Sequence, residues 1–183
     1  VMVYQLLCGR EIAKGDQMAE GMANYCYLVV NTLNRTAIAV DAAWDVKGIY
    51  ALAEQLGVRV RGSIYTHFHF DHCGGDVHPM FAQGREVKLS GAKEIEANGG
   101  EVWAGEGDCA EIMKQCHLSK DITPVGDGDA IDCGDLVLHI LRTPGHTPGS
   151  VCVFAAPRCL SPRGDLGSSP LEETVTKAEA GLL

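Results

Sequence analysis

Residues 64–75 read IYTHFHFDHCGG and place four potential metal ligands within six positions: His67, His69, Asp71 and His72. On an extended backbone alternate residues point to the same side, so His67 and His69 would present their imidazoles together. A turn through Asp71 and His72 would fold these two back toward the first pair, and the two glycines that follow permit a tight exit. Single histidines are often ordinary surface or core groups, but a cluster this dense after an apolar run indicates a metal site.

A second stretch, residues 143–150, reads TPGHTPGS and contains His146 near its centre. Its prolines restrict the backbone on both sides of the histidine, and its glycines let other backbone segments approach closely. Such a loop would hold the imidazole in a defined place, although the same letters taken alone also describe an ordinary proline-glycine turn. Beside the upstream cluster, His146 is a candidate third ligand.

These two stretches, in this order, resemble the HxHxDH signature and the next motif of the metallo-β-lactamase superfamily. The resemblance covers about Asn24 to Phe154, and the wording TPGHTPGS is similar to that of the hydroxyacylglutathione hydrolase (glyoxalase II)-like branch. It implies an α/β fold, namely an αββα sandwich with helices outside two mixed sheets and the site at one edge. Residues 1–183 are expected to form a single such domain, incomplete in its C-terminal half.

By motif position, the resemblance implies that His67, His69 and His146 hold one metal ion and that Asp71 and His72 begin a second site. The family carries a metal-bridging aspartate in a later Gly-Asp pair, and Asp165, 19 residues after His146, is the candidate. The stretch around Asp165 is alternatively a later family segment, in which case the bridge is absent. No histidine follows His146, so the second site is expected to lack its final ligand.

Asp41 ends a predicted strand at residues 36–41 and corresponds to an acidic residue near the metal loop in the family. A carboxylate there would orient a ligand through a hydrogen bond. An aspartate after a strand is also a common turn former, so both interpretations stay open at this point.

Imidazole and carboxylate ligands suit one or two zinc ions, and iron or manganese as well. Three neutral histidines would leave a metal strongly Lewis acidic and so supply hydroxide near neutral pH. We therefore expect a metal-dependent hydrolase of a thioester or ester-like bond, a hydroxyacylglutathione being one candidate substrate, with Asp71 among its catalytic groups. The alternatives are a mononuclear iron oxidoreductase like the persulfide dioxygenases and a truncated, non-catalytic metal-binding product.

The composition limits the partners. A chain of 183 residues with 46% hydrophobic residues fits one domain with a substantial core. A net charge of −9 disfavours nucleic acid and anionic membranes. Neither a membrane span nor a leader is evident. The family resemblance implies a small-molecule substrate, and the oligomeric state is left open. Eight cysteines without a CxxC pair favour reduced thiols in the cytoplasm or an organelle.

Apolar periodicity predicts the surrounding elements. Strands are expected at residues 1–7, 23–30, 36–41, 58–65, 86–90 and 150–154, with two more inside residues 130–145. The first three would form an antiparallel meander. Helices are expected at residues 46–57, 76–84, 91–100 and 108–118, and residues 155–183 read as an atypical loop followed by a terminal helix.

Overall fold

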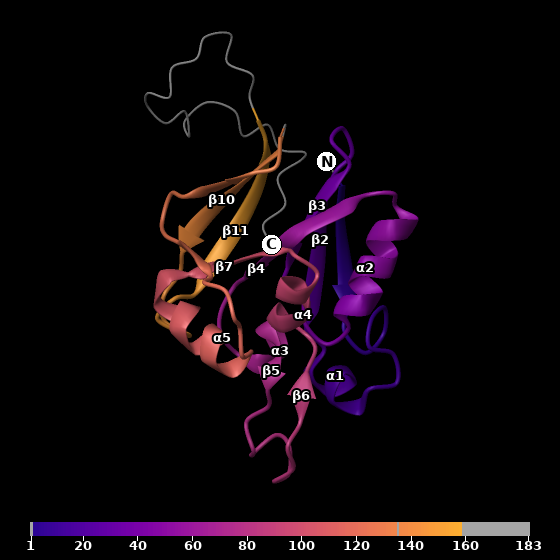
Figure 1. Cartoon of the computed structure of the whole chain (residues 1–183), viewed down its shortest axis with the longest axis vertical. Helices are drawn as coiled ribbons and strands as arrows, with labels where there is room; N and C mark the ends of the chain where they lie inside the picture. The colour runs from indigo at the N-terminus through magenta and orange to yellow at the C-terminus, as the bar shows by residue number, and fades with distance from the viewer. Residues whose placement is uncertain (1, 135, 159–183) are drawn as a thin grey trace.

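A computed structural model describes residues 2–134 and 136–158 and shows two facing β-sheets (Figure 1). The first sheet has six strands in the spatial order β1 (Met2–Leu7), β2 (Tyr25–Asn31), β3 (Thr36–Val40), β4 (Arg59–Tyr65), β7 (Glu101–Gly105) and β8 (Thr123–Val125). Its first three strands pair antiparallel, which confirms the predicted meander, and β3, β4, β7 and β8 pair parallel.

The second sheet is antiparallel, with β10 (Leu136–Arg142) between β9 (Ala130–Asp132) and β11 (Val151–Pro157). A small two-stranded hairpin, β5 (Gly75–Asp76) and β6 (Lys88–Leu89), extends from one end of the molecule (Figure 1). The helices are α1 (Gln17–Met22), α2 (Val46–Gln55), α3 (Phe70–Cys73), α4 (Ala92–Ala97) and α5 (Cys109–Gln115), with a 3₁₀ turn at Glu106–Asp108.

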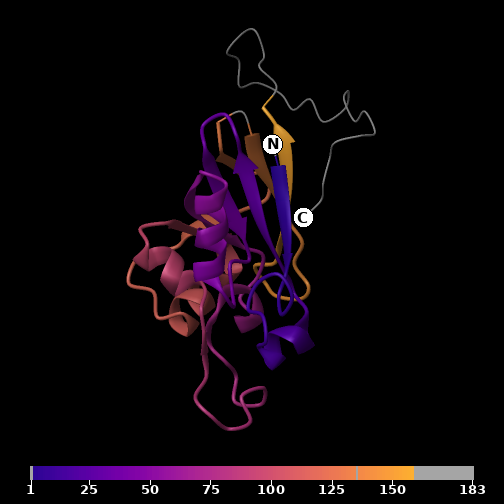
Figure 2. The ribbon, with the colours of Figure 1, turned by 90° about the vertical axis from the view of Figure 1, so that its right-hand side faces the viewer.

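Two apolar cores separate the layers. All five α-helices of the described residues place buried side chains in a core against one face of the first sheet, as Ile49 of α2 and Ile112 of α5 do. The other core lies between the sheets, where Leu138 and Ile140 of β10 pack with Ile38 and Ile64. Figure 1 shows α2 on one side of β2 and β3 and the strands β10 and β11 on the other, and Figure 2 views the molecule from the side that carries α2. The described residues thus supply three layers of the αββα arrangement; the second helical layer is not among them.

Three neighbouring parallel strands of the first sheet end near one another and position the site. β3 is followed by Asp41, β4 by Thr66 and His67, and β7 leads through the 3₁₀ turn to Asp108. Ligand sites of open α/β sheets lie at the carboxyl ends of such strands. The loop between β10 and β11 reaches the same place, because Val151 N donates to Thr66 O at 2.9 Å.

Most predicted elements are confirmed, and the exceptions have local causes. The helix expected at residues 76–84 is wrong: this segment is a hairpin end made of turns, with Pro79 inside it and left-handed backbone at Gln83 and Gly84. The loop expected from Ala155 is also wrong at its start, because β11 continues to Pro157 in register with β10. The remainder of that loop and the expected terminal helix lie outside the described residues.

The sequence pattern did not predict α1, α3, β5, β7, β8 or the 3₁₀ turn at Glu106–Asp108 as elements. Each is short, and β8 contains a proline, which the pattern of β-branched residues does not reveal as a strand. Within the described residues no helix combines the length and apolar character that crossing a membrane requires. The seven described cysteines are free thiols, as expected.

Candidate metal centre

Three histidines from two distant loops converge at the carboxyl end of β4. Each of His67, His69 and His146 offers a ligand nitrogen, and these atoms all lie within 4.8 Å of one another. His69 Nδ1 and His146 Nε2 are 3.0 Å apart. Nitrogens bound to one tetrahedral zinc ion would be ~3.3 Å apart, since each Zn–N bond is about 2 Å long. The residues of this tri-histidine cluster (His67, His69 and His146) therefore fit a metal ion.

The environment keeps the first two histidines neutral, as metal ligation requires. Burial, reinforced by His72, lowers the pKa of His67 to about 4. Burial also lowers the pKa of His69, with the neighbouring His146 acting in the same direction. At neutral pH both rings keep a lone pair for a metal ion.

Asp41 contacts the ring of His67 through Thr66. The Thr66 hydroxyl donates to Asp41 Oδ2 at 2.7 Å and lies 3.0 Å from His67 Nδ1. Because that hydroxyl proton is already used, the threonine oxygen accepts from the protonated Nδ1 and leaves Nε2 as the ligand atom. Asp41 is only 5% exposed and also accepts from Thr66 N at 2.7 Å. Asp41 thus makes the contacts expected of an orienting group and also lies in a turn with left-handed backbone, so its orienting role stays a prediction.

Asp71 and His72 form a neighbouring pair on α3, with 3.5 Å between Asp71 Oδ2 and His72 Nε2. Asn24 contacts both: its Nδ2 lies 2.7 Å from Asp71 Oδ2 and 2.9 Å from His72 Nε2. His72 Nδ1 lies 2.9 Å from Asp41 Oδ2. Although burial lowers the pKa of His72, the hydrogen bond and charge of Asp41 and the charge of Asp71 outweigh it and raise that pKa. We call these two residues the Asp71–His72 pair.

The structure thus separates the predicted ligands into two groups. His67, His69 and His146 come together as predicted, and the Asp71–His72 pair lies beside them, with 4.1 Å between the ring centroids of His67 and His72. Asp165 lies outside the described residues. Metal binding at these positions, and a catalytic role for Asp71, stay predictions.

Asn24, Thr66 and Asp108 contact the site and were missed from the sequence. Asn24 precedes β2 and carries no local signal beyond its position at the start of a strand. Asp108 follows β7, and its place near the histidines could have been inferred only by recognising β7 as a parallel neighbour of β4. The Asp108 carboxylate accepts hydrogen bonds from Phe68 N and from Thr147 Oγ1, each next to a histidine of the cluster.

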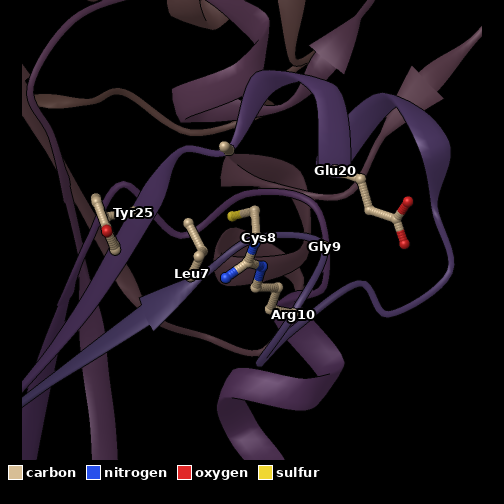
Figure 3. Close-up of a pocket in the computed structure, with 7 residues that line it drawn as sticks. Leu7, Cys8, Gly9, Arg10, Glu20 and Tyr25 are labelled. Carbon is tan, nitrogen blue, oxygen red and sulfur yellow. The ribbon is translucent and has the colours of Figure 1, made fainter.

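A hollow of about 360 Å³ adjoins the segment that carries Asn24 (Figure 3). Ala23 and Tyr25, the chain neighbours of Asn24, line it, and Arg10 and Glu20 contribute charged side chains. It is further lined by Leu7, Cys8 and Gly9. The backbone bond from Cys8 N to Asn24 O, 2.9 Å long, joins this wall to the strand that begins beside the Asp71–His72 pair.

Comparisons with known proteins agree with this geometry. The model of the metallo-beta-lactamase superfamily matches residues 19–158. A probable polyketide biosynthesis zinc-dependent hydrolase of Bacillus subtilis is 26% identical over 133 residues, which are 73% of this chain and 51% of that protein. The hydroxyacylglutathione hydrolase of Anaeromyxobacter dehalogenans is 32% identical over 136 residues, 74% of this chain and 44% of that protein. The chain spans about half the length of these curated relatives.

Solved structures support the same fold. A metallo-beta-lactamase from Staphylococcus aureus superposes with a TM-score of 0.61 at 17% identity, covering 85% of this chain and 38% of that one. ETHE1 from Myxococcus xanthus gives a TM-score of 0.55 at 21% identity, covering 84% and 53%. The relatives carry several different names, so they support the superfamily without selecting the hydroxyacylglutathione hydrolase branch. The chain belongs to the metallo-beta-lactamase superfamily.

Proposed function

We propose that this chain carries the metal centre of a hydrolase that cleaves a thioester or ester-like bond, a hydroxyacylglutathione being one candidate substrate. The observation that carries the proposal is the convergence of His67, His69 and His146, brought from two loops 77 residues apart in the sequence. The relatives, a probable zinc-dependent hydrolase and hydroxyacylglutathione hydrolases, support the reaction class.

The chain's own residues prepare the site for such a reaction. A zinc ion held by the tri-histidine cluster would supply hydroxide at neutral pH. His67 and His69 are kept neutral by burial, and Asp41 fixes the orientation of His67 through Thr66. Asp71 lies beside the cluster with its side chain 18% exposed, which makes it a candidate to accept or hold a proton near a bound carbonyl compound.

We further propose that the tri-histidine cluster binds one ion tightly and that the Asp71–His72 pair binds a second only weakly. The two ligand atoms of the pair already contact the amide nitrogen of Asn24. A second ion there would have to displace this amide and the two hydrogen bonds it makes. Zinc is the first candidate for the tight ion, and iron or manganese suit the same ligands.

The hollow in Figure 3 provides a place for the part of a substrate that does not react. Arg10 and Glu20 bring opposite charges to its wall, and Tyr25, 43% exposed, also lines it. A polar substrate carrying both charges, as a glutathione conjugate does, suits this lining. Arg10→Ala would then raise KM while leaving kcat within about twofold, the signature of lost uniform binding.

The reaction is tested with zinc-loaded chain and S-lactoylglutathione, alongside a simple aryl thioester that lacks the peptide part. We expect turnover of at least one thioester, reduced ~100-fold or more in the His67→Ala/His69→Ala double variant. Hydrolysis equal in wild type and double variant would reject the proposal. Full metal binding without turnover of either compound would favour the non-catalytic metal-binding alternative instead.

A mononuclear iron oxidoreductase like the persulfide dioxygenases is the second candidate. The contacts of Asn24 favour a single ion, and one ion suits this chemistry as well as hydrolysis. Metal analysis of the purified chain separates the two. One equivalent of iron with oxygen uptake on a persulfide substrate would support the oxidoreductase, whereas zinc with thioester turnover would support the hydrolase.

A further inference from the structure

Asp108 stands at the N-cap of α5, yet its side chain makes no hydrogen bond to that helix. An aspartate at this position usually accepts from backbone N–H groups of the first helical turn. Here the carboxylate, 0% exposed, accepts from three groups outside α5: Phe68 N at 3.1 Å, Thr147 Oγ1 at 2.6 Å and Gly149 N at 2.8 Å. Asp108 thus makes long-range contacts instead of the helix cap that its position favours. Such departures from local preference are typical of functional positions.

These three donors belong to the two loops that carry the histidines. Phe68 lies between His67 and His69, so fixing its N–H fixes the backbone that presents both imidazoles. Thr147 follows His146 directly, and its hydroxyl and the nearby Gly149 N–H bind the same carboxylate. Asp108 therefore joins the first histidine loop (residues 66–69) to the second histidine loop (residues 143–150).

The other end of α5 holds the first histidine loop from the opposite side. Gln115 Nε2 donates to Phe68 O at 3.2 Å and to Gly74 O at 2.9 Å. The N–H of Phe68 is thus bound at the start of α5 and its carbonyl at the end. Residues at the two ends of this short helix therefore hydrogen-bond to both peptide groups between the two histidines.

Close backbone packing makes the contact with the second loop possible. A Cβ placed on Gly149 would come within 2.4 Å of Asp108 N and 2.7 Å of Asp108 Cγ. Any side chain at this position would push the loop away from the carboxylate, and with it the neighbouring His146. The glycine therefore belongs to the same arrangement as Asp108.

We propose that Asp108 is a positioning residue for the metal centre: it holds the two histidine loops at the separation that lets His67, His69 and His146 bind one ion. The inference rests on the proposed metal centre. A buried carboxylate with three donors is well satisfied, whereas an asparagine would keep one oxygen and turn an N–H group toward one of those donors. Groups that orient metal ligands typically change metal affinity 10- to 100-fold when they are replaced.

The test compares Asp108→Asn with Glu96→Gln. Glu96 is a matched control because it is also buried, at 6% exposed, and accepts from two backbone amides, Ser119 N and Lys120 N, away from both histidine loops. Zinc affinity is measured by competition with a chromophoric chelator, and the visible spectrum of the cobalt(II)-loaded chain reports ligand geometry. We expect about 10- to 100-fold weaker binding and an altered spectrum for Asp108→Asn only.

A second pair of variants keeps the test independent of folding defects. Thr147→Val removes the hydroxyl that donates to Asp108 while preserving shape, and Thr147→Ser restores it. Hydrogen exchange of the Phe68 and Gly149 amides is measured in the metal-free chain. Asp108→Asn should speed the hydrogen exchange of both amides. Thr147→Val should weaken zinc binding, and Thr147→Ser should keep the wild-type affinity.

The outcomes separate this inference from the proposed function. Wild-type zinc affinity and wild-type amide protection in Asp108→Asn would overturn the positioning role even if the chain proves to be a hydrolase. Equal losses of affinity in Asp108→Asn and Glu96→Gln would also overturn it, because they would indicate general destabilisation. If the wild-type chain binds no metal, the proposed metal centre is wrong and the positioning role falls with it. The amide exchange would then show only whether Asp108 holds the two loops together.

Discussion

The tri-histidine cluster takes two of its three residues from the stretch that also supplies the Asp71–His72 pair, residues 67–72, yet the ligand atoms of the two groups face different partners. The nitrogens of the cluster face one another within 4.8 Å, at spacings that one ion would bridge. The ligand atoms of the pair instead contact Asn24, and Asp41 contacts the far side of His72. Residues of one ligand motif are therefore unequal in the fold, because some face one another and others face additional side chains.

Removal of a cluster histidine should have the largest effect. We expect His146→Ala to weaken zinc binding more than ~100-fold, since loss of a ligand exceeds the 10- to 100-fold cost of losing a group that orients one. Isothermal titration with zinc measures the change. His139→Ala is the control, because His139 is exposed on β10 and contacts Phe154 rather than the cluster. Equal effects of the two variants would contradict a metal site at the cluster.

Asp41→Asn should have the next largest effect, because Asp41 contacts residues of both the tri-histidine cluster's loop and the Asp71–His72 pair. The substitution removes charge from a carboxylate that accepts from Thr66 and lies 2.9 Å from His72 Nδ1. We expect about 10- to 100-fold weaker zinc binding and a loss of about 1–3 kcal/mol in the free energy of unfolding. Chelator competition and urea denaturation give the two numbers. Unchanged zinc affinity would show that the Asp41–Thr66 contact does not orient His67.

Asn24→Ala should bring the metal affinity of the Asp71–His72 pair closer to that of the tri-histidine cluster. Without the amide, Asp71 Oδ2 and His72 Nε2 lose their shared donor and can accept a second ion. We expect the second zinc affinity to rise roughly 10-fold while the first stays constant, a change of about 1.4 kcal/mol. Asn98→Ala, at the exposed C-cap of α4, serves as the control. A lower affinity for the second ion would instead make Asn24 a helper of that site.

In the metal-free chain, His67 and His72 should make the stability depend on pH in opposite directions. The pKa of His67 is lowered to about 4, so the unfolded chain binds more protons between pH 4 and about 6.5, and stability falls as the pH drops through that window. The pKa of His72 is raised, so its contribution is present below about pH 6.5 and is lost as the pH rises through its folded value. Urea denaturation across pH 4–8 measures how the free energy of unfolding depends on pH. The gain in stability with rising pH between 4 and about 6.5 should be smaller in His67→Asn, and the loss of stability at higher pH should be smaller in His72→Asn. The same slope change in both variants would contradict the assignment.

The elements closest to the histidines show what the sequence could predict. The alternating histidines, the β4 strand before them and the loop around His146 were all recognisable from local patterns. The helix expected near Pro79 was wrong because an apolar run in a hairpin end resembles a short helix. Asn24 and Asp108 could not be found locally, because their roles depend on strands and loops far away in the sequence that meet only in the folded sheet.

The number of zinc ions retained per chain after dialysis decides whether a single ion binds at the tri-histidine cluster. Wild type, His146→Ala and His72→Ala are dialysed against buffer with a weak chelator and analysed for zinc and protein. We predict one ion per chain in wild type and in His72→Ala, and none in His146→Ala. Two equally retained ions in wild type, or an ion lost from His72→Ala and kept by His146→Ala, would contradict the binding of a single ion at this cluster.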